Sequence, residues 1–221
     1  FVFDKEGTFI MKKSEQGETL GSGSYRMPLP LPVGEYRIAA WAGVSDDFEM
    51  PELVARKSTL EDLMVRMKRK ESLVHNKALN PLWYGEVKTV DFTGRQEQTE
   101  MVSLIKDTNK FRFILQKSGL GEELDMSDCL FEIHADNGYY DWNNDLLDDD
   151  VISYQPYHLE KVEDVGIVAE MNTMRLLEHK KVYLTLTRKS DSKELMKVDL
   201  IPYLLLTKME GHNIRAVSYT H

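Results

Sequence analysis

Short segments with alternating side chains constrain the fold of this chain more than any other feature. Residues 36–41 (YRIAAW) and 111–116 (FRFILQ) are examples in which successive side chains would face opposite sides of a strand. Stretches rich in Gly, Asp and Asn separate such segments, and long patterns of helical period are rare. The sequence therefore predicts an all-β protein.

Two β-sandwich domains in tandem account best for the number of segments in 221 residues, since one sandwich takes about 100 residues. The best candidate boundary is Gly94–Glu100 (GRQEQTE), which is polar and has no apolar residue. We expect an N-terminal domain over residues 1–97 and a C-terminal domain over residues 98–221. Phe1 and Phe3 already have the character of strand residues, so we also expect strands upstream of Phe1.

Local patterns predict three further elements. Residues 1–13 predict a hairpin, in which Gly7 supplies a positive φ between two β-rich runs. Lys189–Ser192 predicts a polar hairpin turn between the last two strands. Residues 202–207 (PYLLLT) predict a short helix.

Residues 58–70 are ambiguous. Ser58 and Glu61 fit a capping box at the start of a helix. Residues 63–68 alternate as in a strand. Periodicity alone leaves both alternatives open over so short a stretch.

The charge balance argues against one class of partner. The chain has 37 acidic and 28 basic residues, a net charge of −9, whereas non-specific nucleic-acid binding requires a basic surface. We therefore expect no nucleic-acid partner.

Cysteine usage and hydropathy give further bounds. Cys129 is the only cysteine, so no intrachain disulfide can form, and we expect it to be a small core residue. No run of about 18 apolar residues is present that could cross a bilayer. The first residues have none of the features of a signal peptide.

The most polar stretch is Asp136–Asp150 (DNGYYDWNNDLLDDD), which holds six aspartates and three asparagines. A calcium-binding EF-hand loop that began at Asp141 would need Gly at its sixth position and Glu at its twelfth. Leu146 and Ile152 stand there, and a loop that began at Asp136 has Gly138 in place of its second ligand. Asp and Asn also favour turns, because their side chains bond nearby backbone amides. We expect a loop that folds on itself.

Three aromatic residues in this stretch have two interpretations. Tyr139, Tyr140 and Trp142 could form a platform on which a sugar stacks, or they could cover the core at the end of a sandwich, which is the more common use of such residues.

Catalytic and metal-binding signatures are not recognisable. The six aspartates would allow some pair of glycosidase carboxylates in any fold, so they carry no signal. Gly21–Tyr25 (GSGSY) fits neither a phosphate-binding loop nor a nucleophile elbow. No two histidines have the spacing of zinc ligands. The histidines are His75, His134, His158, His179, His212 and His221. We expect a protein that is not an enzyme, with no catalytic, cofactor-binding or metal-binding residues and no cofactor.

Several phrases together, in their order and spacing, resemble one family, the FimB/Mfa-like fimbrial anchor lipoproteins of Bacteroidales, which belong to type V pili. The resemblance covers nearly the whole chain. The phrases are FVFDKEGTFI (Phe1–Ile10), LPVGEYRIAAWAG (Leu31–Gly43), LWYG (Leu82–Gly85), LIKDTNKFRFILQ (Leu104–Gln116), FEIHADNGYYDWNNDLL (Phe131–Leu147), SYQPY (Ser153–Tyr157) and AEMNTMRLL (Ala169–Leu177).

The resemblance implies two transthyretin-like β-sandwich domains. It favours a strand over a helix for Leu63–Lys68. It implies a cell-surface protein of the outer membrane that seats a fimbria of related pilin subunits and is held there by an N-terminal lipid. The family's lipobox cysteine is absent from these 221 residues, and its usual C-terminal strands are absent after Thr207.

Strand addition between subunits is the mode of assembly that the resemblance implies, with pilins as partners. The sequence assigns no docking edge and no interaction residues. Two alternatives remain: a surface carbohydrate-binding module or adhesin with no role in pili, and a calcium-stabilised adhesin.

Overall fold

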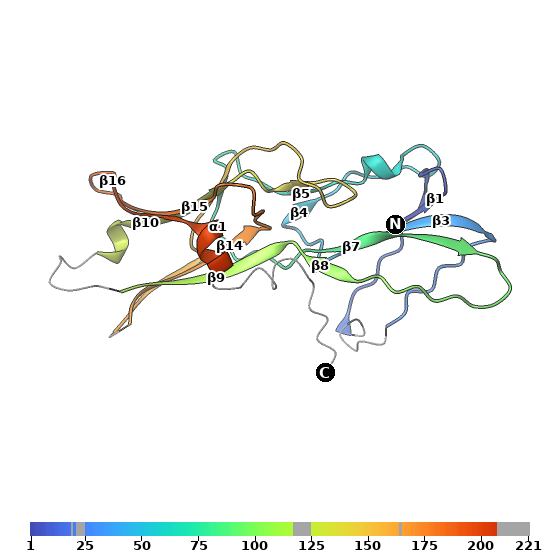
Figure 1. The fold of residues 1–221 in the computed structure, drawn as a ribbon, viewed down its shortest axis with the longest axis horizontal. Coiled ribbons are helices and arrows are strands. Elements are labelled where there is room, and N and C mark those ends of the chain that lie inside the picture. Colours follow the sequence, from blue (N-terminus) through green and yellow to red (C-terminus); the bar gives the residue numbers. More distant parts are fainter. Residues whose placement is uncertain (19, 21–24, 117–124, 164, 207–221) are drawn as a thin grey trace.

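The structure, a computed structural model, describes residues 1–206 apart from residues 19, 21–24, 117–124 and 164. Within this part the chain forms four β-sheets, one short α-helix and short 3-10 turns, so the all-β prediction is confirmed. Figure 1 shows an elongated molecule, with the first strands of the chain towards one end and its last strands towards the other.

The N-terminal sheet is antiparallel and has the order β2–β1–β3–β7–β8. Its strands are β1 (Val2–Asp4), β2 (Phe9–Met11), β3 (Gly34–Ala42), β7 (Trp83–Phe92) and β8 (Leu104–Lys106). The hairpin predicted over residues 1–13 is confirmed as β1 and β2, with Gly7 at a φ of 89° between them.

The strand predicted from the alternation within residues 36–41 is confirmed as β3. Ala39 is buried in a small N-terminal core, against which Trp41 also packs, so these two side chains share one face of the strand. A β-bulge lies opposite Ala39 in the neighbouring strand, because Ile38 pairs with Lys88 whereas Ala40 pairs with Gly85. The extra residue of the bulge therefore belongs to β7.

The C-terminal sheet has the order β16–β15–β10–β12–β6, in which only the pair β12–β6 is parallel. Its strands are β6 (Val74–His75), β10 (Cys129–Ala135), β12 (Ile152–Tyr154), β15 (Tyr183–Arg188) and β16 (Lys193–Asp199). The hairpin turn predicted at Lys189–Ser192 is confirmed between β15 and β16. The 3-10 turn η3 (Met126–Asp128) leads into β10.

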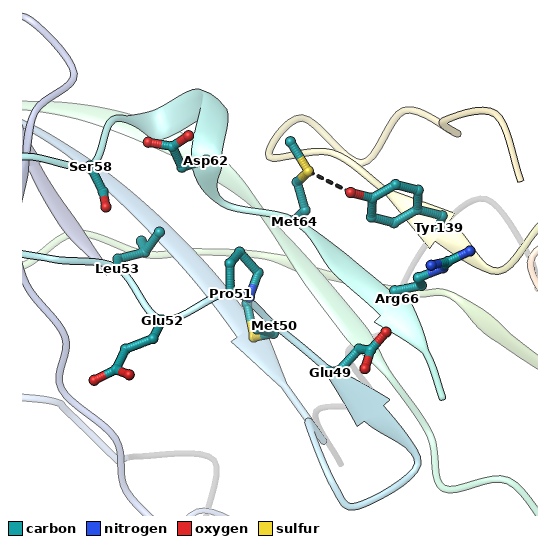
Figure 2. Close-up of a pocket in the computed structure, with 10 residues that line it drawn as sticks. All are labelled: Glu49, Met50, Pro51, Glu52, Leu53, Ser58, Asp62, Met64, Arg66 and Tyr139. Atoms are coloured by element: carbon teal, nitrogen blue, oxygen red, sulfur yellow. Dashed lines mark hydrogen bonds between the residues drawn. The ribbon is translucent and has the colours of Figure 1, made fainter. Parts of the chain in front are cut away.

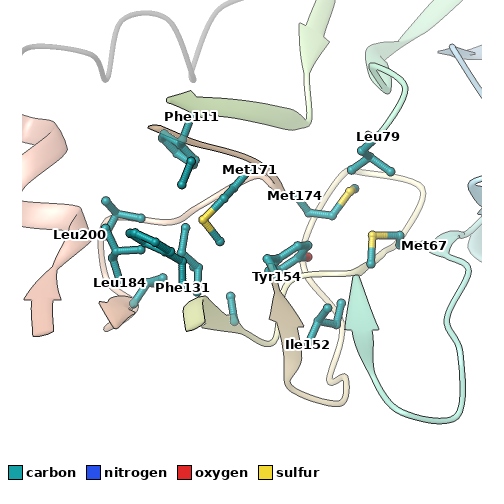
Figure 3. Close-up of a cluster of buried hydrophobic side chains, with 14 of the residues drawn as sticks. Met67, Leu79, Phe111, Phe131, Ile152, Tyr154, Met171, Met174, Leu184 and Leu200 are labelled. Atoms are coloured by element: carbon teal, nitrogen blue, oxygen red, sulfur yellow. The ribbon is translucent and has the colours of Figure 1, made fainter. Parts of the chain in front are cut away.

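A three-stranded sheet, β13–β14–β9, forms the second layer of this sandwich. Its strands are β9 (Thr108–Leu115), β13 (His158–Val162) and β14 (Gly166–Met174). The large core between the two layers includes Phe111, Phe131 and Met171, and Figure 3 shows their side chains pointing toward one another. The predicted short helix is confirmed as α1 (Leu200–Leu206), which packs Leu200 and Leu204 into this core and begins two residues before the predicted range.

A bridging sheet connects segments that are far apart in the sequence. It has the order β11–β5–β4, formed by β4 (Phe48–Glu49), β5 (Val65–Met67) and β11 (Tyr139–Tyr140). Trp41 and Met50 pack against both the large core and a smaller N-terminal core around Phe3 and Leu60. The two cores are therefore joined by shared side chains.

The ambiguous residues 58–70 form a short helical turn followed by a short strand. The turn is the 3-10 turn η2 (Leu60–Asp62). Its capping residue is Thr59, one residue after the predicted Ser58, and the Thr59 N–H donates a hydrogen bond to the Asp62 carboxylate at 2.8 Å. Strand β5 follows, with Val65 and Met67 buried. The strand that the family resemblance favours is confirmed over these three residues.

The predicted boundary, Gly94–Glu100, lies in the connection between β7 and β8. Pairing crosses it three times, because β8 pairs with β7, β11 with β5, and β12 with β6. The division into residues 1–97 and 98–221 stays a prediction. Gly21–Ser24, His212, His221 and the chain from Thr207 onward lie outside the described residues.

One strand serves both halves of the molecule. β8 and β9 run from Leu104 to Leu115 with Asp107 as the only residue between them. The Asp107 N–H donates to the Leu82 carbonyl at 2.8 Å, and its carbonyl accepts from the Arg175 N–H at 2.7 Å. Since these two groups of one extended residue point to the same side, β7 and β14 lie end to end along one edge of the strand. Among the described residues, no strand pairs with its opposite edge.

Substitution of Gly43 tests how closely the chain after β3 approaches the segment before β7. Gly43 has a φ of 76°, and a Cβ there would collide with the Pro81 carbonyl oxygen. Gly43→Ala should lower the free energy of unfolding by about 2–5 kcal/mol, from a backbone cost of about 1–2 and an overpacking cost of about 1–3 kcal/mol. Chemical denaturation measures this value.

The matched control is Gly17→Ala. Gly17 also has a positive φ, of 123°, but a Cβ there would meet no atom within 4 Å. It should show the backbone cost alone, and equal losses in both variants would contradict the close approach at Pro81.

Candidate functional site

The polar stretch Asp136–Asp150 lies between β10 and β12 and carries β11. It folds on itself as predicted. The Asp141 carboxylate accepts hydrogen bonds from the backbone N–H groups of Asn143 and Asp145, each at 2.9 Å, and the Asp141 N–H donates to the Asp145 carbonyl at 3.0 Å. Asn144, at a φ of 65°, takes the left-handed conformation that Asn tolerates in such turns.

Most acidic side chains of this stretch have protein partners. Asp149, whose side chain is fully buried, accepts hydrogen bonds from Arg66 at 3.0 Å and from Arg69. Asp136 accepts from the Lys180 ammonium at 2.8 Å. In the described part of the chain no three His, Cys, Asp or Glu side chains gather as they would to hold a metal ion.

A glycine makes room for one of these ion pairs. Gly138 is buried, and a Cβ at this position would press against Ile152, Arg69 and Asp149. Because the glycine has no side chain, the Arg69 guanidinium can approach Asp149 beside β11. The pair fixes the end of the polar stretch to the residues that follow β5.

A buried polar network forms where β8 passes into β9. Asp107 is 0% exposed, and its carboxylate accepts a hydrogen bond from the Asn144 side-chain amide at 3.0 Å. The Arg175 side chain lies 3.5 Å from the same carboxylate oxygen and also donates to the Asn144 carbonyl. The Arg175 guanidinium lies 5.4 Å from the centre of the Tyr140 ring. The network thus joins the strand of residues 104–115, the polar stretch and the end of β14.

Burial controls the ionisation of this network. Loss of water raises the pKa of Asp107 from 3.8 to about 6, and the hydrogen bond from Asn144 and the charge of Arg175 offset only part of the increase. Burial likewise raises the pKa of Tyr140 well above its ordinary value. The second oxygen of the Asp107 carboxylate has no partner among the described residues.

A second set of contacts holds the same junction. The Asn137 side-chain amide donates to the carbonyls of Met174 at 3.0 Å and Arg175 at 2.9 Å. The Tyr154 hydroxyl donates to the Asn137 side-chain oxygen at 2.7 Å. The polar stretch therefore binds the end of β14 at two points, Asn137 near its start and Asn144 in its middle.

The aromatic residues of the polar stretch do not form one exposed platform. Tyr140 is 0% exposed and belongs to the large core, whereas Trp142 packs against the N-terminal core. Tyr139 is half-buried, with the Arg66 guanidinium 5.3 Å from its ring centre and its hydroxyl donating to the Met64 sulfur at 2.7 Å. The structure favours the interpretation in which these residues cover the cores.

An open groove of about 600 Å³ lies beside Tyr139, and Figure 2 shows the side chains around it. We call it the acidic groove. Its lining residues are Glu49, Met50, Pro51, Glu52, Leu53, Ser58, Asp62, Met64, Arg66 and Tyr139. Three are carboxylates, and Arg66 is the only cation among the ten.

The other residues considered from the sequence lie outside the groove and the network. Cys129 is buried in the large core as predicted, and burial raises the pKa of its thiol. His134 is an exposed residue of β10, with its ring nitrogen 3.9 Å from a Glu132 carboxylate oxygen. His75 is half-buried, and burial lowers its pKa.

Sequence reasoning missed Asp107, Arg175 and the groove. One signal was available for Asp107, because Lys106, Asp107, Thr108 and Asn109 form a polar run inside an otherwise alternating strand. No local signal marks Arg175 or the groove, since both depend on pairings between distant segments.

Comparison with known proteins identifies a family and several relatives. The family model described as "Fimbrillin-A associated anchor proteins Mfa1 and Mfa2" matches residues 1–219. A relative, the minor fimbrium anchoring subunit Mfa2 of Porphyromonas gingivalis, is 21% identical, over 99% of this chain and 67% of its own length.

Two solved structures from Bacteroides are similar to the whole fold. One from Bacteroides thetaiotaomicron, described as "putative polysaccharide binding proteins", is 43% identical with a TM-score of 0.90, over 97% of this chain and 75% of its own. One from Bacteroides ovatus, described as "a putative adhesin", is 28% identical with a TM-score of 0.82, over 93% of this chain and 69% of its own.

The buried carboxylate predicts a specific pH dependence of stability. The pKa of Asp107 is higher in the folded than in the unfolded chain, so the folded state binds the proton more tightly. Its contribution is fully present below pH 3.8 and is lost as the pH rises through about 6. Relative to Asp107→Asn, the wild type should lose roughly 3 kcal/mol of unfolding free energy across this range.

Urea denaturation of both proteins at a series of pH values measures the difference. The matched control is Asp148→Asn, which removes an exposed carboxylate of the polar stretch and so separates the loss of any negative charge from the loss of the buried one. A constant difference between the wild type and Asp107→Asn would contradict the role of burial.

Proposed function

The chain belongs to the family of fimbrillin-A associated anchor proteins Mfa1 and Mfa2, and we propose that it is a cell-surface protein that seats a pilus of related subunits on the outer membrane. The observation that carries this proposal is the family match over residues 1–219. The all-β fold and the relative that anchors the minor fimbrium of Porphyromonas gingivalis support it. The family points to a structural role and to pilin subunits as partners, not to catalysis.

Contact with the pilus would occur by strand addition, in which an extended segment of a pilin pairs with an open sheet edge. The edge of residues 104–115 opposite β7 and β14 is the best candidate, because it is continuous over two sheets. Its outward residues Lys110, Arg112 and Ile114 are exposed, whereas Phe111 faces the core. Backbone pairing would supply the strength, and the alternating side chains would set the register.

Attachment to the outer membrane would use an N-terminal lipid, as the family resemblance implies. No helix in the described part of the chain is long and apolar enough to cross a membrane. Because one acyl chain binds a bilayer only marginally, stable attachment requires a second signal, such as a second acyl chain.

A second candidate is a surface adhesin or carbohydrate-binding module without a role in pili. It is favoured by the descriptions of the two Bacteroides structures, one as polysaccharide-binding and one as an adhesin. Glycan binding by the purified chain, together with normal fimbriae in cells that lack the gene, would favour this function over the anchor.

Deletion of the gene tests the anchor role. Cells without it should carry fimbriae of altered length or should release them into the medium, because the seat on the membrane is lost. Electron microscopy and immunoblots of the culture supernatant measure length and release. Restoration by the full-length gene is the control, and fimbriae that are normal in length and retention would overturn the proposal.

A single introduced cysteine tests the docking edge. Cys129 is buried, so a cysteine in place of Ile114, which is 51% exposed on β9, would be the accessible thiol. When it carries a photoactivatable cross-linker on cells, it should form a covalent product with a pilin subunit. The matched control is Val151→Cys, which is 54% exposed and lies outside β9. Cross-linking that is equal at both positions, or absent at Ile114, would exclude this edge.

A further inference from the structure

The acidic groove has carboxylates that form no close ion pair with the described part of the protein. Arg66 lies opposite Glu49 across β5 and β4, but its ion pairs are with Asp149, at 3.0 Å, and Asp150, at 3.8 Å. Asp62 accepts the Thr59 N–H. Glu49 and Glu52 are exposed, and in the described part of the chain no cationic side chain lies within ion-pair distance of either. Two exposed carboxylates without an ion pair among the described residues therefore line the groove.

The wall of the groove also has free backbone groups. Residues 50–53 follow the edge strand β4 without forming a helix or strand. Within the described residues, none of their N–H or C=O groups has a hydrogen-bond partner in the protein. Pro51 has no N–H, but the other residues of this segment can still both donate and accept. Such a segment can pair with an added extended chain.

The floor of the groove is apolar. Met50, Leu53 and Met64 line it, and Met50 and Leu53 also pack against the N-terminal core. Methionine side chains adapt to partners of different shape, which suits a binding surface. The groove thus combines exposed carboxylates, free backbone and an adaptable apolar floor.

We propose that the acidic groove binds an extended, basic segment of a partner protein, in which lysine or arginine residues alternate with apolar ones. The cations would pair with Glu49 and Glu52, and the backbone of the segment would hydrogen-bond residues 50–53. The apolar side chains on the opposite face would lie against Met50, Leu53 and Met64. This inference does not depend on the anchor role, because it rests on the groove alone.

A sugar fits the same groove less well. Stacking on a sugar requires a free aromatic face, and Tyr139 is the only aromatic residue in the lining. Its ring lies under the Arg66 guanidinium, and its hydroxyl is held by the Met64 sulfur. A neutral sugar would also leave the charges of Glu49 and Glu52 unpaired.

Binding of a defined peptide tests the proposal. The probe is a fluorescein-labelled heptapeptide of alternating lysine and valine, and fluorescence anisotropy measures its affinity for the full chain. The double variant Glu49→Gln, Glu52→Gln should weaken binding about three- to tenfold at low salt, because two exposed ion pairs are lost and each strengthens binding only a few-fold. The difference should shrink at high salt, where exposed charges are screened.

The matched control is the double variant Glu97→Gln, Glu178→Gln, which changes the net charge equally at exposed positions outside the groove. It should bind like the wild type. Equal weakening in both double variants would overturn the proposal, because the peptide would then respond only to the net charge of −9.

Methyl NMR provides a second readout that does not depend on the glutamate variants. The peptide should shift the methyl signals of Met50 and Met64 but not that of Met101, which is 83% exposed and lies outside the groove. The absence of such shifts would overturn the proposal. Shifts of Met50 and Met64 caused by a neutral oligosaccharide, without any caused by the peptide, would also overturn it and would assign the groove to a glycan.

Discussion

The rest of the structure depends on one buried carboxylate at the point where a single strand leaves the N-terminal sheet and enters the C-terminal sandwich. The Asp107 backbone N–H donates to Leu82, which precedes β7 of the N-terminal sheet. Its carbonyl accepts from Arg175, which follows β14 of the C-terminal sandwich. Its side chain meets Asn144 and the Arg175 side chain. A buried charge is costly unless it is paired, so these partners must hold their positions for the halves to join.

The polar stretch between β10 and β12 serves this junction. Asn137 binds the end of β14, and Asn144 binds Asp107. Asp149 forms ion pairs with Arg66, in β5, and with Arg69, two residues after it. Tyr140 fills the large core and Trp142 packs on the small one. A stretch whose composition resembles a cation-binding loop therefore connects distant segments of the fold, and most of its amides and carboxylates bind protein groups.

Local patterns predicted the elements whose partners are near in sequence. The first hairpin, the turn between β15 and β16, and the helix α1 all follow from short-range rules. The pairs β11–β5 and β12–β6 did not, because two-residue strands have no readable period and join residues far apart in the chain. The bulge in β7 was not predicted for another reason: it depends on how β7 pairs with β3, and the sequence of β7 alone does not reveal that an extra residue lies opposite Ala39.

The run of β8 directly into β9 has a mechanical consequence. A tension applied along residues 104–115 would act parallel to the strand, so the hydrogen bonds to β7 and β14 would be sheared together and not opened one after another. The two halves would transmit that tension through a continuous covalent backbone, with no flexible linker between them to extend first. The molecule would therefore behave as one stiff element in series with whatever is attached to its ends.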